Sequence, residues 1–119
     1  MVFSFFVIRT HIIFEFYKAN RDVLAKTETL KMAIDKALSD LNLSLRQDSY
    51  IQFEPEGVTA TVVGEFFHFS IHTWPEFMSC AVDLYTAKDQ FYGREIANAL
   101  AREFKAQEYD LKILTRTQK

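Results

Sequence analysis

The spacing of the apolar residues constrains this chain most, because it changes between the period of a strand and that of a helix. Phe, Ile and Val crowd into Val2–Tyr17, which predicts one extended strand or two joined strands. Apolar residues then recur at helical spacing from Leu24 to Leu41, after Asn20 and Asp22, which can cap a helix. The first third of the chain is therefore expected to form a strand followed by a helix.

The rest of the chain predicts three strands, a second helix and a closing strand. Short turns between consecutive strands favour a largely antiparallel sheet, and two helices can cover one of its faces. We therefore expect an α+β fold, a two-layer sandwich whose other sheet face, carrying Phe and Thr, is covered by a partner subunit. The expected elements are strands at Ser44–Phe53, Val58–Ser70, Cys80–Thr86 and Asp110–Thr117, a helix at Tyr92–Lys105, and a turn at Glu54–Gly57.

Length and composition narrow the possible functions. A chain of 119 residues suits a single domain spanning residues 1–119. A net charge of −2 offers no broad basic surface, so we expect no binding to nucleic acid polymers. Cys80 is the single cysteine and no metal-ligand spacing is present, which fits a reducing cytoplasm. Val2–Ile8 is shorter than the roughly 20 apolar residues of a membrane span, so we expect a cytoplasmic protein without membrane contact, with secretion as the alternative.

Several motifs carry a family resemblance. The segment His68–Glu76 reads HFSIHTWPE and is followed by AVDLYT at Ala81–Thr86. Upstream, Thr10–Tyr17 reads THIIFEFY and Phe53–Gly57 reads FEPEG. These segments resemble the bacterial S-adenosylmethionine (AdoMet) decarboxylases, with an ungapped match from Gly57 to Ala87. The resemblance implies that family's fold and AdoMet as the ligand.

The reactive positions of that family differ here. In the family, the chain cleaves itself between a Glu and a Ser, and the Ser becomes the pyruvoyl group that acts as electron sink. Phe66 and Phe67 stand at those two positions, and Ala87 stands at the family's catalytic cysteine. A phenyl ring has no hydroxyl for the acyl shift, and an alanine cannot deliver a proton. We therefore expect no self-processing, no pyruvoyl cofactor and no metal.

The resemblance also implies substrate-binding residues. Phe53 matches an aromatic residue that stacks on adenine, and Glu76 matches a carboxylate that accepts from the ribose hydroxyls. Thr59 replaces a serine involved in processing, and His72 matches the processing histidine, with His68 a weaker candidate for substrate contact. Each has a plainer interpretation: core packing for Phe53, a solvated turn for Glu76, and inherited scaffold for the histidines.

Glu65 is a further candidate from strand parity. If Val58–Ser70 is one strand, Thr59, Glu65 and Phe67 share a face. Phe67 would then line the substrate site, and Glu65 would face the sulfonium or ammonium group and act with His72 as a catalytic residue. The alternative for Glu65 is an exposed carboxylate at a strand edge. Trp74 is expected to pack.

These observations lead to a functional hypothesis. An AdoMet pocket lined by apolar residues where the reactive groups were lost could promote attack of the substrate's own carboxylate, releasing methylthioadenosine and homoserine lactone. We therefore predict a pyruvoyl-independent lyase acting on AdoMet or an AdoMet–nucleotide conjugate, in a setting of phage or CRISPR defence. The alternatives are an inactive regulatory partner of an active decarboxylase and an AdoMet or nucleotide sensor. A homo-oligomer, dimer or trimer, is expected in each case.

Overall fold

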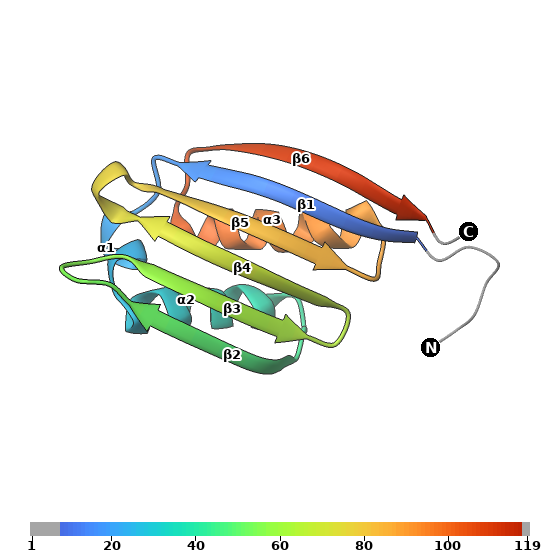
Figure 1. The fold of residues 1–119 in the computed structure, drawn as a ribbon, viewed down its shortest axis with the longest axis horizontal. Coiled ribbons are helices and arrows are strands. Elements are labelled where there is room, and N and C mark those ends of the chain that lie inside the picture. The colour runs from blue at the N-terminus through green and yellow to red at the C-terminus, as the bar shows by residue number, and fades with distance from the viewer. Residues whose placement is uncertain (1–7, 118–119) are drawn as a thin grey trace.

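The computed structural model describes residues 8–117 and the side chains of residues 9–116, which form a β-sheet with helices on one face (Figure 1). The sheet has six strands in the order β2-β3-β4-β5-β1-β6, and every neighbouring pair is antiparallel. The α+β, two-layer prediction is therefore confirmed. The strands are β1 (Ile8–Tyr17), β2 (Leu45–Gln52), β3 (Val58–Gly64), β4 (Phe67–Trp74), β5 (Ser79–Thr86) and β6 (Glu108–Thr117).

Three α-helices cover the sheet, one more than predicted: α1 (Arg21–Ala25), α2 (Thr27–Asp40) and α3 (Gln90–Phe104). The single helix expected before Leu41 is interrupted because Lys26 is extended, with φ −127° and ψ 151°. Lys26 provides no side-chain cap for α2, and Gln52 of β2 supplies one instead, since its Oε1 accepts from the Thr27 N–H at 2.8 Å. A short 3-10 helix, η1 (Pro75–Phe77), joins β4 to β5. Within residues 8–117, no helix is long and apolar enough to cross a membrane.

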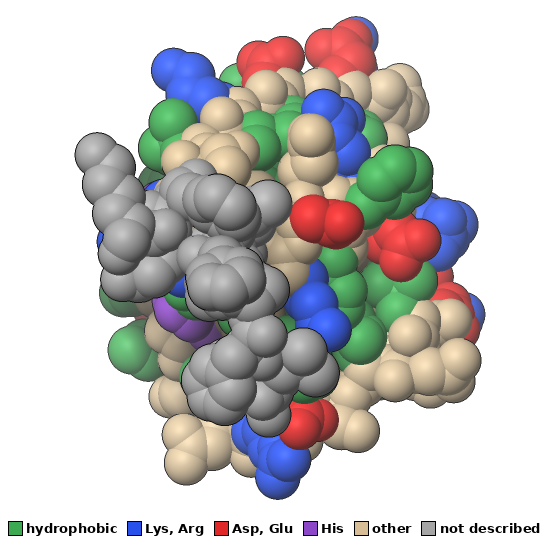
Figure 2. Space-filling view, turned by 90° about the vertical axis from the view of Figure 1, so that its right-hand side faces the viewer, with side chains coloured by type: hydrophobic (Ala, Val, Ile, Leu, Met, Phe, Trp, Pro, Cys, Tyr) green, Lys and Arg blue, Asp and Glu red, His purple; other side chains and the backbone are tan. Residues whose placement is uncertain are grey.

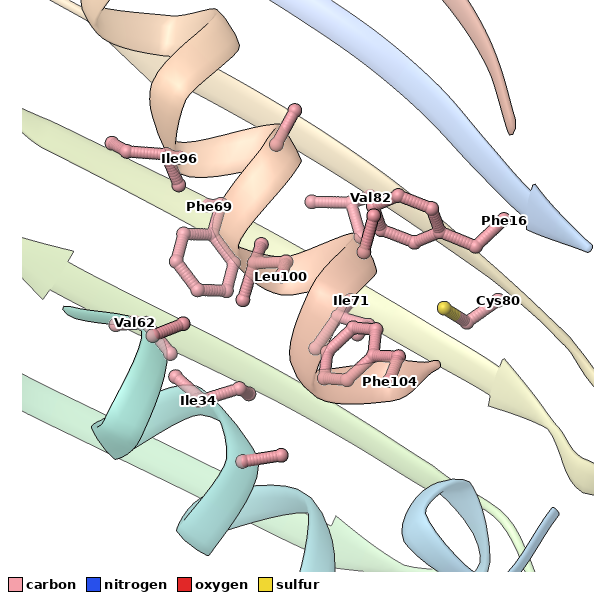
Figure 3. Close-up of a cluster of buried hydrophobic side chains, with 14 of the residues drawn as sticks. Phe16, Ile34, Val62, Phe69, Ile71, Cys80, Val82, Ile96, Leu100 and Phe104 are labelled. Atoms are coloured by element: carbon pink, nitrogen blue, oxygen red, sulfur yellow. The ribbon is translucent and has the colours of Figure 1, made fainter. Parts of the chain in front are cut away.

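The core lies between the helices and one face of the sheet. Figure 3 shows Phe69 and Ile71 of β4 packed beneath Leu100 and Phe104 of α3, with Ile34 of α2 beside them. All five side chains are at most 1% exposed. Burying large apolar side chains of this kind stabilises the fold by about 1.5–3 kcal/mol each.

The opposite face, here called the outer face, carries mostly polar side chains. Within residues 8–117 no helix lies over it (Figure 1). Thr59 and Thr61 of β3 point outward, as predicted, but the Phe residues of β4 point into the core. The expectation of outward Phe side chains is therefore wrong.

Figure 2 shows one end of the molecule, where Lys and Arg side chains are interspersed with Asp and Glu and no broad basic patch is visible.

The predicted strand Val58–Ser70 is also wrong, because two strands occupy this region. β3 ends at Gly64, Glu65 and Phe66 form a tight turn, and β4 starts at Phe67. A Cβ at position 64 would overlap the Phe67 ring, so glycine leaves the space in which that ring packs. Residues 8–117 therefore contain six strands and not five. The part of the predicted first strand that covers residues 2–7 lies outside the described residues.

The two ends of the sheet carry different connections between strands (Figure 1). The loop end, at the left of Figure 1, carries the loop 53–57 between β2 and β3, together with η1. The turn end, at the right, carries the Glu65–Phe66 turn and the start of β1. Along β4, seven residue steps separate them, or about 23 Å.

Candidate functional site

An open hollow of about 310 Å³ lies at the loop end. It collects four of the residues that the sequence proposed for substrate binding or catalysis: Phe53, Thr59, His72 and Glu76. Four elements bring them together: the loop after β2, the adjacent strands β3 and β4, and η1. The other residues that line it are Glu56, Gly57, Val58, Thr73 and Trp74.

The floor of the hollow is a cross-strand pair. Thr59 and His72 are partners in the antiparallel register of β3 and β4, and both point to the outer face. Thr59 Oγ1 lies 2.9 Å from His72 Nδ1, a hydrogen-bond distance. This bond orients the imidazole ring and leaves Nε2 as its other polar atom.

Backbone hydrogen bonds close the loop 53–57 and attach it to α1. The Phe53 N–H donates to the Gly57 carbonyl at 2.8 Å, and the Gly57 N–H donates to the Ala25 carbonyl at 3.0 Å. Gly57 has φ +114°, a conformation that L side chains rarely adopt, so this turn requires glycine. Thr73 fixes the other wall, because its hydroxyl donates to the Leu24 carbonyl at 2.9 Å and accepts from the Val58 N–H at 2.9 Å.

Two aromatic side chains are exposed at the hollow. Phe53 is 51% exposed and Trp74 is 44% exposed, and both line the hollow, which contradicts core packing for either residue. Exposed rings beside polar groups can stack on a planar ligand. The prediction that Trp74 packs is wrong. Side chains alternate along a strand, so Trp74 lies on the same outer face as His72, two residues before it.

Charged groups surround the rim. Arg21 donates from Nη2 to Glu56 Oε1 at 2.6 Å and from Nε to the same oxygen at 3.1 Å. Its hydrogen bond and charge attraction to Glu56, with a smaller contribution from Glu76, raise the pKa of the guanidinium. Glu76 is exposed at the first turn of η1 and has no ion pair within residues 8–117, so both of its oxygens can accept from a ligand.

Three predicted site residues lie elsewhere. Glu65 is in the turn at the other end of the sheet, where its nearest cation is Arg46 at 3.9 Å. Phe67 faces the core and is 4% exposed. His68 is on the outer face but at the turn end, stacked on Tyr85 with ring centroids 5.3 Å apart. The shared face of Thr59, Glu65 and Phe67 is therefore wrong, because the turn breaks the alternation on which it rested.

The turn itself is closely packed. The Phe66 carbonyl accepts from Thr86 Oγ1 at 2.8 Å and from the Ala87 N–H at 2.9 Å. The Phe67 ring stacks on Phe69, with centroids 6.2 Å apart, and lies 6.4 Å from the Tyr92 ring. The position therefore contributes to the core and presents no apolar chamber to a ligand.

The single cysteine of the chain is not exposed as a nucleophile. Cys80 is fully buried on the core face, and burial raises the pKa of its thiol. Among residues 8–117, no group of three or more His, Cys, Asp or Glu is placed to hold a metal ion.

Comparison with known proteins gives the class of this fold and site. The sequence profile of S-adenosylmethionine decarboxylase matches residues 10–117, nearly the whole chain. The chain belongs to the S-adenosylmethionine decarboxylase family.

Curated relatives agree with this assignment. The chain is 39% identical to the S-adenosylmethionine decarboxylase proenzyme of Thermosipho melanesiensis over 79 residues, which are 66% of this chain and 61% of that one. It is 30% identical to the proenzyme of Archaeoglobus fulgidus over 110 residues, 92% of this chain and 98% of that one. The match therefore spans less than two thirds of some relatives and nearly all of others.

Solved structures share the fold. The crystal structure of the adenosylmethionine decarboxylase from Aquifex aeolicus matches with a TM-score of 0.80 and 27% identity, covering 91% of this chain and 89% of that one. The Trypanosoma brucei AdoMetDC-delta26 monomer matches with a TM-score of 0.57 and 17% identity over 87% of this chain and 45% of that one, which shows the fold alone.

These findings correct the functional hypothesis. The prediction of a pyruvoyl-independent lyase releasing homoserine lactone is wrong, because the relatives are named decarboxylase proenzymes. The structure gives a physical reason: Phe67, expected to line an apolar reaction chamber, packs into the core. The comparisons favour neither the regulatory partner nor the sensor.

The pyruvoyl group that the family implies does not fit these residues. The segment Gly64–Phe67 contains no hydroxyl or thiol side chain from which a pyruvoyl could form.

Proposed function

We propose that this chain binds AdoMet through its adenosyl group at the loop end and remains a single, unprocessed chain. The observation that supports this most is the hollow itself, in which Phe53, Thr59, His72 and Glu76 line one space. Relatives named decarboxylase proenzymes support AdoMet as the ligand.

The binding mode follows from the chemistry of the wall. The exposed faces of Phe53 and Trp74 stack on the adenine, since every base offers a π face. The Glu76 carboxylate accepts from the two ribose hydroxyls, because a carboxylate provides several acceptor sites on two oxygens. The negative charge of Glu76, which has no ion pair within residues 8–117, also favours a ligand that carries a sulfonium cation over a neutral one.

The unprocessed state follows from the turn end. Neither Phe66 nor Phe67 offers a nucleophile, and the Phe67 side chain is fixed in the core. Decarboxylation by the family's electron sink is therefore not expected from this chain alone.

We also propose a homo-oligomer in which outer faces meet. The outer face has no covering element within residues 8–117, and the chain places its ligand hollow and its turn at opposite ends of that face (Figure 1). Two copies paired face to face would combine one loop end with the other turn end. Light scattering on the purified protein tests this, since a monomer at micromolar concentration would contradict it.

The binding test uses Trp74, the single tryptophan of the chain. Because Trp74 lines the hollow, its fluorescence reports directly on occupancy. We expect a saturable change on titration with AdoMet, and the same change with methylthioadenosine, which keeps the adenosyl group. Carbon dioxide release from AdoMet, or a cleaved chain, would contradict the proposal, as would a titration without any fluorescence change.

A further inference from the structure

Arg21, the first residue of α1, lies behind the wall of the loop-end hollow. It does not line that hollow, whereas its partner Glu56 does. Both Nη2 and Nε of Arg21 donate to the same oxygen, Oε1 of Glu56. The carboxylate is the more buried partner, because the Glu56 side chain is 19% exposed and that of Arg21 is 57% exposed. Arg21 can therefore act on a ligand in the hollow only through Glu56.

The rim of the hollow holds a second carboxylate. Glu76 of η1 also lines the hollow and has no ion pair within residues 8–117. Its charge contributes to the raised pKa of the Arg21 guanidinium, so Glu76 and Arg21 are within electrostatic range of each other. The two carboxylates and the guanidinium together carry a single net negative charge. Without Arg21, the same rim would carry a second one.

The charge of the rim matters because AdoMet carries a positive charge on its sulfur. S-adenosylhomocysteine has the same adenosyl group and the same amino acid tail, but its sulfur lacks the methyl group and is uncharged. A free carboxylate near the ribose attracts the sulfonium and not the neutral thioether. Between unit charges a few ångström apart, this attraction changes an affinity several-fold even in water.

We propose that Arg21 is a positioning residue that sets, through Glu56, how strongly the hollow prefers a sulfonium ligand over the neutral thioether. The ion pair neutralises Glu56 and leaves Glu76 as the carboxylate that accepts from the ribose hydroxyls. Loss of Arg21 frees the charge of Glu56 and increases the preference for the sulfonium. Loss of Glu56 leaves a guanidinium beside the hollow and decreases it. The inference rests on the proposed function, because it concerns the ligand bound at the loop end.

The fold does not depend on this ion pair. A pair with an exposed partner contributes little to stability. The loop 53–57 also stays attached to α1 without it, because the Gly57 N–H and the Gln52 Nε2 both donate to the Ala25 carbonyl at 3.0 Å. Variants of Arg21 and Glu56 are therefore expected to fold, so a change in their binding reports on the rim.

The test compares the affinities of AdoMet and S-adenosylhomocysteine in the Trp74 fluorescence titration. Arg21→Gln should raise the ratio of the AdoMet affinity to the S-adenosylhomocysteine affinity by about threefold to tenfold, the size expected for one unit charge a few ångström away. Glu56→Gln should lower the ratio by a similar factor. The double variant should return to the parent ratio, because it removes one charge of each sign. Arg21→Lys, which keeps the charge, should keep the ratio.

Lys36→Gln is the matched control, because it removes a cation that is paired with Asp40 at 2.8 Å on α2 and does not line the hollow. Its ratio should equal that of the parent. An unchanged ratio in Arg21→Gln, even with both affinities weakened, would make the ion pair a purely structural contact and overturn the inference. An equal shift in Lys36→Gln would make the effect one of total charge and overturn it as well. A parent protein that binds neither ligand would instead contradict the proposed function and remove this inference with it.

Discussion

The loop end and the turn end are built on the same two strands, β3 and β4, yet they have diverged in opposite directions. At the loop end, polar and aromatic side chains remain exposed around a hollow. At the turn end, the position where the family resemblance places a reactive serine holds Phe67, which is buried. If the loop end binds the ligand as proposed, ligand binding and reaction chemistry are separable in this fold, because the two ends lie about 23 Å apart along one strand.

The largest expected effect is at the turn end. Phe67→Ser should lower the free energy of unfolding by about 3–5 kcal/mol, the usual cost of truncating a buried Phe, and should not produce self-cleavage. Urea unfolding and intact mass measure the two outcomes. If the variant is fully stable and cleaves itself before residue 67, Phe67 is not a core residue and the contrast between the ends fails.

A second prediction at the turn end concerns the contact between Gly64 and the Phe67 ring. Gly64→Ala should destabilise the parent, because the new Cβ would overlap the Phe67 ring, and should cost much less in a Phe67→Ala background. Unfolding of the single and double variants gives the coupling energy, which we expect to be about 1–3 kcal/mol. Additive effects would contradict a ring packed over Gly64.

At the loop end, Phe53→Ala should weaken AdoMet binding about tenfold to a hundredfold, because a stacked base loses roughly 1–3 kcal/mol on alanine substitution. The measurement is the Trp74 fluorescence titration. Phe91→Ala is the control, since Phe91 is an exposed Phe on α3 away from the hollow. Equal losses in both variants would show that the effect is not local to the hollow.

A smaller loss is expected for Glu76→Gln, about tenfold, because glutamine keeps one acceptor oxygen but not the charge. Glu54→Gln is the matched control, since Glu54 is an exposed carboxylate of the loop 53–57 that does not line the hollow. Unchanged binding in Glu76→Gln would remove the ribose contact from the proposed mode.

The smallest effect concerns pH. Burial, with the charges of Asp83 and Asp110, raises the pKa of Glu15 from 4.5 in the folded protein. The folded state then holds this proton to higher pH than the unfolded state, so stability falls as pH rises from about 4.5 through the raised value. Glu15→Gln should therefore raise Tm at neutral pH and leave it unchanged below pH 4.5. A lower Tm at pH 7 would contradict this.

Most of the fold could be predicted from the sequence, because its elements have clear periodicity. The strand ending at Tyr17, the helix near Tyr92–Lys105 and the last strand were predicted within a few residues of β1, α3 and β6. The turn at Glu65–Phe66 was missed, since its residues do not carry the usual Asn-Gly or Asp-Gly signal. Local spacing could not show that Gly64 makes room for a ring from the next strand.

The site was predictable where the motif was complete. Phe53, Thr59, His72 and Glu76 were proposed by resemblance, and the structure brings them together, while their roles stay predictions. Glu65 was misplaced because its assignment depended on strand parity continuing through an unrecognised turn. Trp74 was expected to pack, and the structure instead exposes it at the hollow.

Native mass spectrometry of the purified protein with AdoMet tests the central claim most directly. We predict an intact chain of 13.9 kDa, as the sequence requires, that carries AdoMet of unaltered mass. A chain split before residue 67, or AdoMet converted to its decarboxylated form, would show that the turn end has kept the reaction. An intact chain that never retains AdoMet would show that the loop end has lost the ligand.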